Sequence, residues 1–408
     1  MSAPTALEVH VDMRGTTVLA GIAYLSARRG AVTTRFEYDR GYLSTPGSFD
    51  LSPHLRRQDR GATTNGLPGA CADSAPDRWG RNLIKRRVQA AARDTRTTPE
   101  AITEIDYLCG VSDITRQGAL RFRARGGGPF VADSLDVPRL IELPALLAAT
   151  REVTRGADDL TAIKLLLAAG SASLGGARPK ASVRDGDRLA IAKFPHHTDD
   201  WDVIAWEATM LDLAAHCEIT VPRHRLETIS GASVLLLDRF DRDGQRRVPY
   251  ISAMTLLDRT DGQDADYVEI AEAISAHGAN VNDDLRQLWR RIAFSVAVNN
   301  TDDHLRNHGL LHAAGGWMLA PVFDVNPNPD QAAHRATSVV GATDRAGCLR
   351  ALLDGAEYFA YTPSAALETW SLIIAAVAAW RGVATANGIS VAEQRRFADT
   401  LDSVPIPG

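Results

Sequence analysis

The sequence predicts an α+β fold with a small β-rich part at the N-terminus and a mostly helical part at the C-terminus. Residues 5–45 alternate apolar and polar side chains over short runs, which is typical of an antiparallel sheet with one buried face. Beyond residue 251 the apolar side chains recur mostly at helical spacing. With 408 residues, of which 45% are hydrophobic, the chain can bury a large core and form two or three domains.

The first predicted domain, residues 1–125, continues past this sheet into a basic helix within residues 71–93. Pro76 fits the start of that helix, and Asp77 favours the positive end of its dipole. Further patterns predict a helix over 99–110 and a strand over 117–123. The many arginines of this region indicate a solvated surface, with a partner protein or a phosphate backbone as alternatives. The glycine-rich residues 125–129 mark the boundary.

The second and third predicted domains are residues 138–250 and 251–408. In the second, two strands meet at the hairpin signal Asp185-Gly186, and an apolar strand lies within 233–242. In the third, two apolar strands joined by a Gly-Gly turn interrupt the helices. The helices predicted by apolar periodicity are 138–150, 158–169, 202–216, 270–277, 283–298, 345–360, 364–386 and 391–402.

The most informative motif lies between the third domain's longest amphipathic helix and its two strands. Asp302 and Asn307 are five residues apart, and a hairpin then leads to Asp324. Protein kinases use this Asp-to-Asn spacing in their catalytic loop, followed by a second, metal-binding Asp. We therefore interpret Asp302 as the base or hydroxyl-orienting residue. Asn307 and Asp324 would bind Mg²⁺, which prefers oxygen donors. The alternative is a polar turn between a helix and a strand.

Two histidines of the same stretch offer a rival metal site. His304 and His308 have the i, i+4 spacing that suits zinc on a helix. Leu305 occupies the position where a metalloprotease has its glutamate. We therefore expect His304 to brace the loop beside the cofactor through hydrogen bonds.

A small-residue loop precedes the hairpin of the second domain. It contains Ser171, Ser173, Gly175 and Gly176, and such a loop lets backbone N–H groups approach phosphates. It matches neither the Walker A pattern nor the kinase glycine-rich loop, so a plain lead-in to the hairpin is the alternative.

Lys193 lies in AIAKF, which is similar to the strand-lysine motif VAIK of kinases and predicts a catalytic contact with ATP phosphates. Lys180 is a candidate for a second phosphate contact. Glu207, on the helix 202–216, is the candidate that pairs with the strand lysine, and an exposed helix glutamate is the alternative.

Asp238 and Phe240 lie where a hinge beside adenine would fall in a protein-kinase-like fold of two lobes. Residues 138–250 would then form the N-lobe and residues 251–408 the helical C-lobe. The alternative for this segment is a buried strand with a charged end.

Composition excludes several classes of protein. The net charge of −5 disfavours a protein that coats nucleic acid by itself. The four cysteines form no CxxC pair, which favours reduced thiols. The N-terminus has no signal-peptide pattern, and the longest apolar helical run, residues 372–380, is too short to span a bilayer. We expect a cytoplasmic protein without a membrane partner.

These motifs together resemble the HipA family of serine/threonine kinase toxins from bacterial toxin–antitoxin systems. The matching pieces cover most of the chain, and they read SAPDRWGRNLIKRR, RQGALRF, SLGGARPK, AIAKF, LLDRFDR, YISAMTLL, NNTDDHLRNHG and APVFDVNP. The resemblance implies Asp302 as the catalytic residue, Asn307 and Asp324 as Mg²⁺ ligands, and Lys193 at the ATP phosphates. It also implies Asp238 and Phe240 at the adenine hinge.

The resemblance further implies that Ser173 in the glycine loop is autophosphorylated, which switches off ATP binding, with Ser171 as the alternative acceptor. It implies a small helix-turn-helix antitoxin, HipB-like, which supplies most of the contact with operator DNA. Aminoacyl-tRNA synthetases are the substrates that it suggests. Two departures from the founding type are residues 250–257 and Asp303, which could be a second acidic residue near the metal or a loop brace.

Two other functions compete with a protein kinase toxin. One is a catalytically silent, nucleotide-binding co-repressor of the antitoxin, against which the intact catalytic set argues. The other is a kinase for a lipid or a small molecule on a similar fold.

Overall fold

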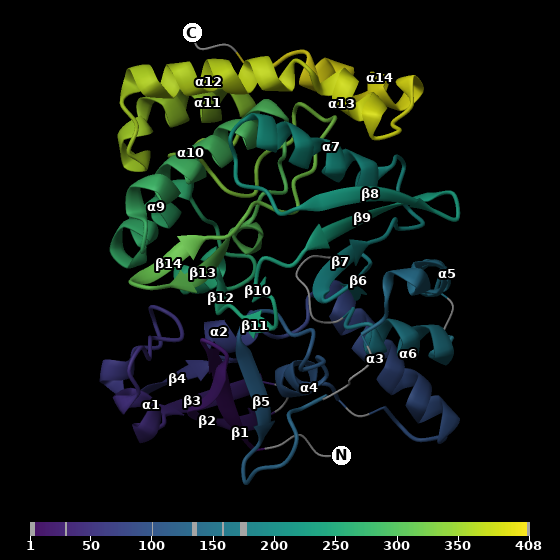
Figure 1. The fold of residues 1–408 in the computed structure, drawn as a ribbon, viewed down its shortest axis with the longest axis vertical. Helices are drawn as coiled ribbons and strands as arrows, with labels where there is room; N and C mark the ends of the chain where they lie inside the picture. Colours follow the sequence, from purple (N-terminus) through teal and green to yellow (C-terminus); the bar gives the residue numbers. More distant parts are fainter. Residues whose placement is uncertain are drawn as a thin grey trace. The chain divides into compact units, whose positions relative to one another are not determined.

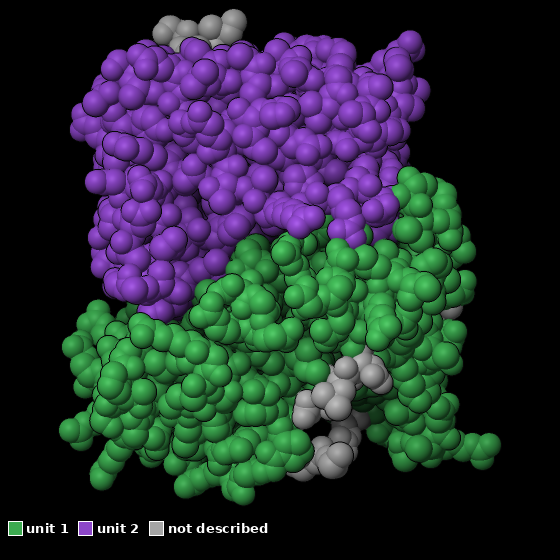
Figure 2. All heavy atoms as spheres, in the orientation of Figure 1, with its two compact units in different colours: residues 1–198, 228–232, 236–251 green, residues 199–227, 233–235, 252–408 purple. Residues whose placement is uncertain are grey.

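The computed structural model describes residues 5–28, 31–99, 101–132, 137–156, 159–171 and 178–405. The chain divides into two compact units, coloured separately in Figure 2. Unit 1 comprises residues 1–198, 228–232 and 236–251, and unit 2 comprises residues 199–227, 233–235 and 252–408. The predicted α+β class is confirmed, with strands concentrated near the N-terminus and helices near the C-terminus (Figure 1). The three domain ranges stay predictions.

The N-terminal part of unit 1 is a five-stranded sheet with the order β4-β3-β2-β1-β5. Its strands pair antiparallel, and a bulge lies between Val9 and His10. In β3 the even-numbered residues are buried, as the alternation in the sequence predicts. The strands are β1 (Ala6–Met13), β2 (Thr16–Arg28), β3 (Ala31–Tyr38), β4 (Gly61–Asn65) and β5 (Leu120–Ala124).

Several helices of unit 1 start at polar caps. Asp77 accepts a hydrogen bond from the Gly80 N–H, so α3 begins where the sequence predicts a helix start. The next helix is shorter than the predicted range 99–110, because a capping box between Thr103 and Asp106 sets its start. These helices are α1 (Arg40–Ser44), α2 (Gly69–Ala72), α3 (Arg78–Asp94), α4 (Glu104–Cys109), α5 (Leu143–Thr154) and α6 (Leu160–Ala168).

The predicted hairpin at Asp185-Gly186 is present. It joins β6 (Lys180–Asp185) to β7 (Arg188–Lys193), and Lys180 is the register partner of Lys193. Their sheet has the order β6-β7-β9-β8, and the division between the units falls within β8 (His224–Ile229) and β9 (Ala232–Asp238). Short strands follow in β10 (Arg242–Asp243), β11 (Arg246–Arg247) and β12 (Tyr250–Ser252).

Unit 2 is mostly helical. Asp202 caps α7, and a hairpin of β13 and β14 follows α10. The helix predicted over 364–386 is in fact two, which are separated at Ala378 and Ala379. The elements are α7 (Val203–His216), α8 (Ala253–Leu256), α9 (Tyr267–His277), α10 (Val281–Ala297), β13 (Gly309–Ala313), β14 (Gly316–Leu319), α11 (Arg345–Asp354), α12 (Pro363–Val377), α13 (Trp380–Ala386) and α14 (Val391–Leu401).

Among the described helices, none is by itself long and apolar enough to cross a membrane. Only α12 and α13 taken together meet the requirements of length and composition, and the pair is bent by 44°.

Candidate functional site

The loop that carries the kinase-like motif follows α10 and is pinned by its backbone. Asn299 has a left-handed backbone with φ of 56°, which asparagine tolerates better than most residues. Its side-chain amide donates to the carbonyl oxygens of Asn328 and Asp330, both at 2.9 Å. Thr301 accepts the Asn328 amide at 2.8 Å and, through its carbonyl, the Ala336 N–H at 2.9 Å. Segments far apart in sequence therefore fix this loop.

Asp302, Asn307 and Asp324 all belong to unit 2. The Asn307 side-chain nitrogen donates to the Asp302 carbonyl at 3.1 Å, which leaves the amide oxygen as the atom that could coordinate a cation. Asp324 follows the β13–β14 hairpin and has a left-handed backbone with φ of 60°. Its N–H donates to Glu207 Oε1 at 3.1 Å, and Glu207 is buried on α7. Glu207 therefore contacts the backbone of the predicted metal ligand.

The carboxyl of Asp302 lies in a crowded environment although the residue as a whole is exposed. Partial burial raises the pKa of Asp302, the charge of His304 lowers it, and the charges of Asp324 and Asp303 raise it further. Carboxylates that repel one another beside an amide oxygen are a donor set that suits Mg²⁺, because a bound cation relieves the repulsion. The residues present therefore fit the metal that the motif predicts.

Asp303 is a loop brace, which decides between the two roles that the sequence left open. It is buried, and its carboxylate accepts the Tyr267 hydroxyl at 2.5 Å and the Ser295 hydroxyl at 3.3 Å. Nε2 of His308 lies 3.0 Å from its other oxygen. Burial would raise the pKa of Asp303, but the charge of His308 and these hydrogen bonds hold it well below its ordinary value.

Further buried groups support the same brace. The Thr337 hydroxyl donates to the Asp303 carbonyl at 2.6 Å. Arg335 donates to the hydroxyl of Ser295 at 2.5 Å, and Arg345 donates to the carbonyl of Val296 at 2.9 Å. Cations at the last carbonyls of α10 oppose the negative end of its dipole. No local pattern in the sequence indicates these partners, because they lie tens of residues from the loop.

The histidines of the loop occupy different environments. His308 is buried against Asp303, as described above. The His304 N–H donates to the Asp302 carbonyl at 3.1 Å, whereas its ring Nδ1 has no hydrogen-bond partner among the described residues. The bracing role expected of the His304 side chain stays a prediction. Within the described part of the chain, no three His, Cys, Asp or Glu side chains are grouped so that they could hold a metal ion by themselves. A Mg²⁺ site on Asn307 and Asp324 does not need such a group, because Mg²⁺ is usually bound by one or two carboxylates together with water and phosphate oxygens.

The predicted phosphate-binding lysines lie in unit 1, on the β6–β7 hairpin. Both are buried. Nζ of Lys180 lies 2.6 Å from Asp77 Oδ2, so this lysine already holds the capping residue of α3. That ion pair neutralises the Lys180 charge, which weakens the reason for assigning it to a phosphate. The roles of Lys180 and Lys193 stay predictions.

The predicted hinge residues are also in unit 1. The Asp238 carboxylate lies 3.5 Å from an Arg188 nitrogen. The Phe240 ring lies 6.2 Å from that of Tyr250. Arg239 lies between these two residues and Asp241 follows them, and both are buried in an ion-pair network. The alternative prediction, a buried strand with a charged end, therefore describes the backbone well. Whether adenine binds here stays a prediction.

The predicted glycine loop lies largely outside the described residues. Ser173, Gly175 and Gly176 all fall in residues 172–177, which the structure does not describe. Ser171 is described, and it is buried with its hydroxyl unpaired among the described residues.

Comparison with known families matches both halves of the chain. The model of the HipA-like C-terminal domain matches residues 172–380, about half of the sequence. The model of the HipA N-terminal domain matches residues 17–98. The second match covers most of the five-stranded sheet and α3, and the first covers every candidate site residue except Ser171.

The individual proteins similar to this chain include one from Haemophilus influenzae and one from Shewanella oneidensis MR-1. A Haemophilus influenzae protein named "Putative kinase" is 30% identical over 129 residues, and this match spans 27% of this chain and 38% of that relative. The HipA of Shewanella oneidensis MR-1, solved with HipB and operator DNA, superposes with a TM-score of 0.68 at 14% identity. That superposition covers 98% of this chain and 95% of the other, and at this identity it shows a common fold.

Proposed function

Because this chain belongs to the HipA family, we propose that it is a Mg-ATP-dependent kinase that phosphorylates serine or threonine hydroxyls of a protein. One observation carries the proposal: Asp302, Asn307 and Asp324 lie near one another in unit 2, and buried hydrogen bonds hold the loop of Asp302 and Asn307 in place. A catalytic constellation must be held by its surroundings, and this loop is held on several sides. The kinase name of the Haemophilus influenzae relative agrees with it.

The roles follow from the chemistry of phosphoryl transfer. Asp302 orients the attacking hydroxyl and accepts its proton as the bond from oxygen to the γ-phosphorus forms and ADP leaves. Lys193 contacts the phosphates, and Asp238 and Phe240 contact the adenine. Asn307 and Asp324 would hold Mg²⁺, which when bound neutralises charge on the phosphates. Glu207 fixes the backbone of Asp324, so it acts on the metal ligand as a positioning residue.

The finer assignments extend this proposal. The protein would be the toxin of a toxin–antitoxin module, with a HipB-like helix-turn-helix antitoxin that carries most of the DNA contact. The Shewanella oneidensis HipA was solved with HipB and operator DNA, which supports such a partner. A translation component such as an aminoacyl-tRNA synthetase would be the substrate. Phosphorylation of Ser173 would place a dianion on a loop that receives ATP phosphates, and so repel them.

The test is to incubate the protein with Mg-ATP and measure its intact mass, beside Asp302→Ala. We expect a phosphate-sized gain that maps to Ser173, and a rate at least roughly a hundredfold lower in the variant, because a positioned base contributes about 10²–10⁴ in rate. Asp402→Asn, which removes a half-exposed carboxylate elsewhere in unit 2, is the matched control. Equal rates in Asp302→Ala and the wild type would refute the assignment. ATP binding without phosphate gain would favour the co-repressor.

A further inference from the structure

Residues 111–118, here called the junction loop, connect α4 to β5 and are held by buried arginines. Arg116, from the loop itself, is fully buried. It donates to the carbonyls of Ser74 at 2.8 Å, Leu108 at 3.0 Å and Val111 at 2.8 Å. These carbonyls are the only charge compensation that Arg116 receives through hydrogen bonds in the described residues. The arginine therefore fixes the loop to the ends of α2 and α4.

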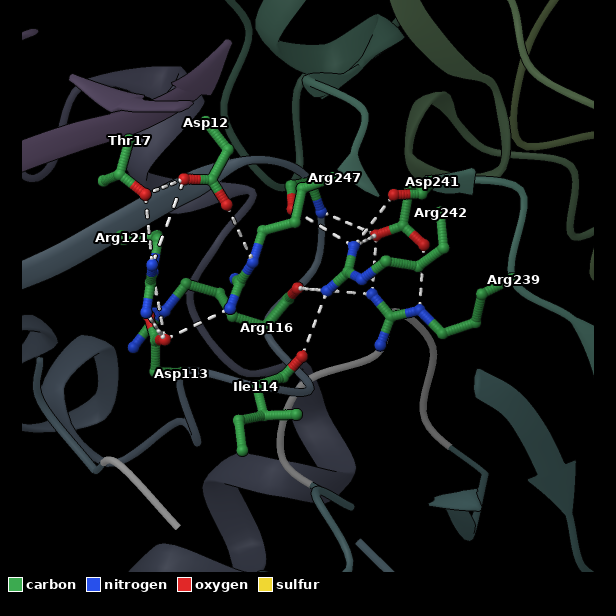
Figure 3. Close-up of polar contacts among 11 residues, drawn as sticks. Asp12, Thr17, Asp113, Ile114, Arg116, Arg121, Arg239, Asp241, Arg242 and Arg247 are labelled. Carbon is green, nitrogen blue, oxygen red and sulfur yellow. Dashed lines mark hydrogen bonds and ion pairs between the residues drawn. The ribbon is translucent and has the colours of Figure 1, made fainter. Parts of the chain in front are cut away.

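The junction loop also accepts hydrogen bonds from the segment that contains the predicted hinge residues. Arg239 donates to the Thr115 carbonyl at 2.5 Å. It also donates to the Arg116 carbonyl at 3.3 Å (Figure 3). Arg242 donates to the Arg116 carbonyl at 2.6 Å and to the Ile114 carbonyl at 3.2 Å. Two guanidinium groups from one short segment thus cover successive carbonyls of the loop.

Asp241 joins the two arginines to the end of the loop. Its carboxylate accepts Arg239 at 2.6 Å, Arg242 at 2.8 Å and the N–H of Gly118 at 2.7 Å (Figure 3). Burial would raise the pKa of Asp241, but the charges of both arginines hold it well below its ordinary value. Asp241 is therefore ionised and central to the network.

The junction loop also contacts the N-terminal sheet. Asp113 lies 2.6 Å from an Arg121 nitrogen, on β5, and 3.1 Å from an Arg247 nitrogen, on β11. Arg247 in turn lies 3.2 Å from Asp12, on β1. These ion pairs are buried or nearly so. Separating such a pair is costly, because each charge would then be buried without a partner of opposite charge.

A fourth contact reaches the segment that precedes the predicted glycine loop. Gly170 has a left-handed backbone with φ of +63°, and a Cβ there would lie 2.3 Å from Thr115 Oγ1. Only glycine fits this close approach. Thr115 therefore contacts the backbone at Gly170, and its carbonyl accepts a hydrogen bond from Arg239.

We propose that the junction loop is a positioning element for nucleotide binding, which sets the place of Asp238 and Phe240 through Arg239 and Asp241. The inference rests on the proposed ATP-binding function. Arg239 and Asp241 alternate in sequence with Asp238 and Phe240. A shift of Arg239 or Asp241 therefore also shifts the two hinge residues. Because the loop also contacts Gly170 and the N-terminal sheet, it ties the hinge segment and Gly170 to the sheet.

The test separates nucleotide binding from phosphate transfer. In Asp241→Asn the amide can still accept the Gly118 N–H but no longer compensates two buried arginines. We expect the Kd for ADP, measured by calorimetry, to rise by at least about tenfold. The rate of autophosphorylation at saturating ATP should stay within about threefold, because Asp302 and its loop lie in unit 2 and are untouched.

A milder variant and a control keep the test decisive. Gly118→Ala leaves every charge in place but strains a backbone with φ of +73° and places a Cβ 3.2 Å from Tyr250. It should raise the Kd in the same direction if Asp241→Asn does not fold. Tyr38→Phe removes a buried hydrogen bond of β3 to Leu55 and should lower stability without changing the Kd.

The outcomes are distinguishable. Folded Asp241→Asn and Gly118→Ala with a wild-type Kd would overturn the positioning role. An equal rise in Kd for Tyr38→Phe would also overturn it, since general loss of stability would then explain the effect. A wild-type protein that binds no ADP and transfers no phosphate would remove the proposed function and this inference together.

Discussion

Tyr267→Phe tests the brace behind the catalytic loop without touching any residue assigned to catalysis. Tyr267 begins α9, is buried, and donates its hydroxyl to Asp303 at 2.5 Å. Phenylalanine fills nearly the same volume, so the substitution removes the hydrogen bond and little packing. The carboxylate of Asp303 loses the nearest of its donors among the described residues, and the neighbouring Asp302 loses part of its support.

The magnitude follows from the contacts that remain. A hydrogen bond to an ionised acceptor contributes about 1.5–3 kcal/mol. After the substitution, Asp303 keeps His308 at 3.0 Å and the Ser295 hydroxyl at 3.3 Å, which is long for a bond between oxygens. Because the second donor compensates weakly, we expect the free energy of unfolding to fall by about 2 kcal/mol. The rate of phosphate transfer should fall as well, since Asp302 is held less firmly.

Urea denaturation followed by tryptophan fluorescence measures the first quantity, and a double-mutant cycle with Asp303→Asn isolates the pair. Tyr358→Phe is the matched control, because Tyr358 is a half-exposed tyrosine of unit 2 and should change stability by less than about 0.5 kcal/mol. A Tyr267→Phe protein as stable as this control would refute the brace, as would a coupling energy near zero in the cycle.

Two further predictions concern unit 2. If Glu207 holds the Asp324 N–H, Glu207→Gln should keep most activity, and Glu207→Ala should need more Mg²⁺ for activity. If Glu207 instead pairs with Lys193, both variants should lose activity equally. A titration of activity against Mg²⁺ decides between the two roles. The hydrogen bond to Asp212 raises the pKa of His224 above its ordinary 6.5 and exceeds the lowering by burial. The contribution of this ion pair to the free energy of unfolding is therefore full below pH 6.5 and is lost as pH rises through the raised pKa. His224→Gln should destabilise the protein more at about pH 6 than at about pH 9. Equal losses of stability in denaturant melts at the two pH values would contradict the ion pair.

Local signals in the sequence predicted the elements of the fold well. The Asp185-Gly186 turn and the Asp77 cap were recognisable because each depends on a few adjacent residues. The break between α12 and α13 was missed, because the alanines at 375, 376, 378 and 379 favour a continuous helix. Burial of Trp380 against Trp206 belongs to tertiary packing, which periodicity does not encode.

The site could be predicted only as far as its motif extends. The spacing of Asp302, Asn307 and Asp324 is a property of one stretch, and the structure gathers all three in one unit. The role of Asp303 was undecided in the sequence, because its donor Tyr267 is 36 residues away. The arginines between residues 78 and 125 were expected on a solvated surface, and Arg116 is instead fully buried. Composition cannot distinguish a solvated guanidinium from one that covers carbonyls.

The junction loop bears on whether the polypeptide must be continuous. Gly126, Gly127 and Gly128 are exposed and all have positive φ, so a protease could nick the chain there. Asp12, Asp113 and Arg121 would lie on one fragment, and Arg239, Asp241 and Arg247 on the other. Because buried ion pairs and carbonyl contacts join the two sets, the cut pieces should stay together in native buffer and part only in denaturant. The chain could then be made as two separately expressed fragments that complement each other.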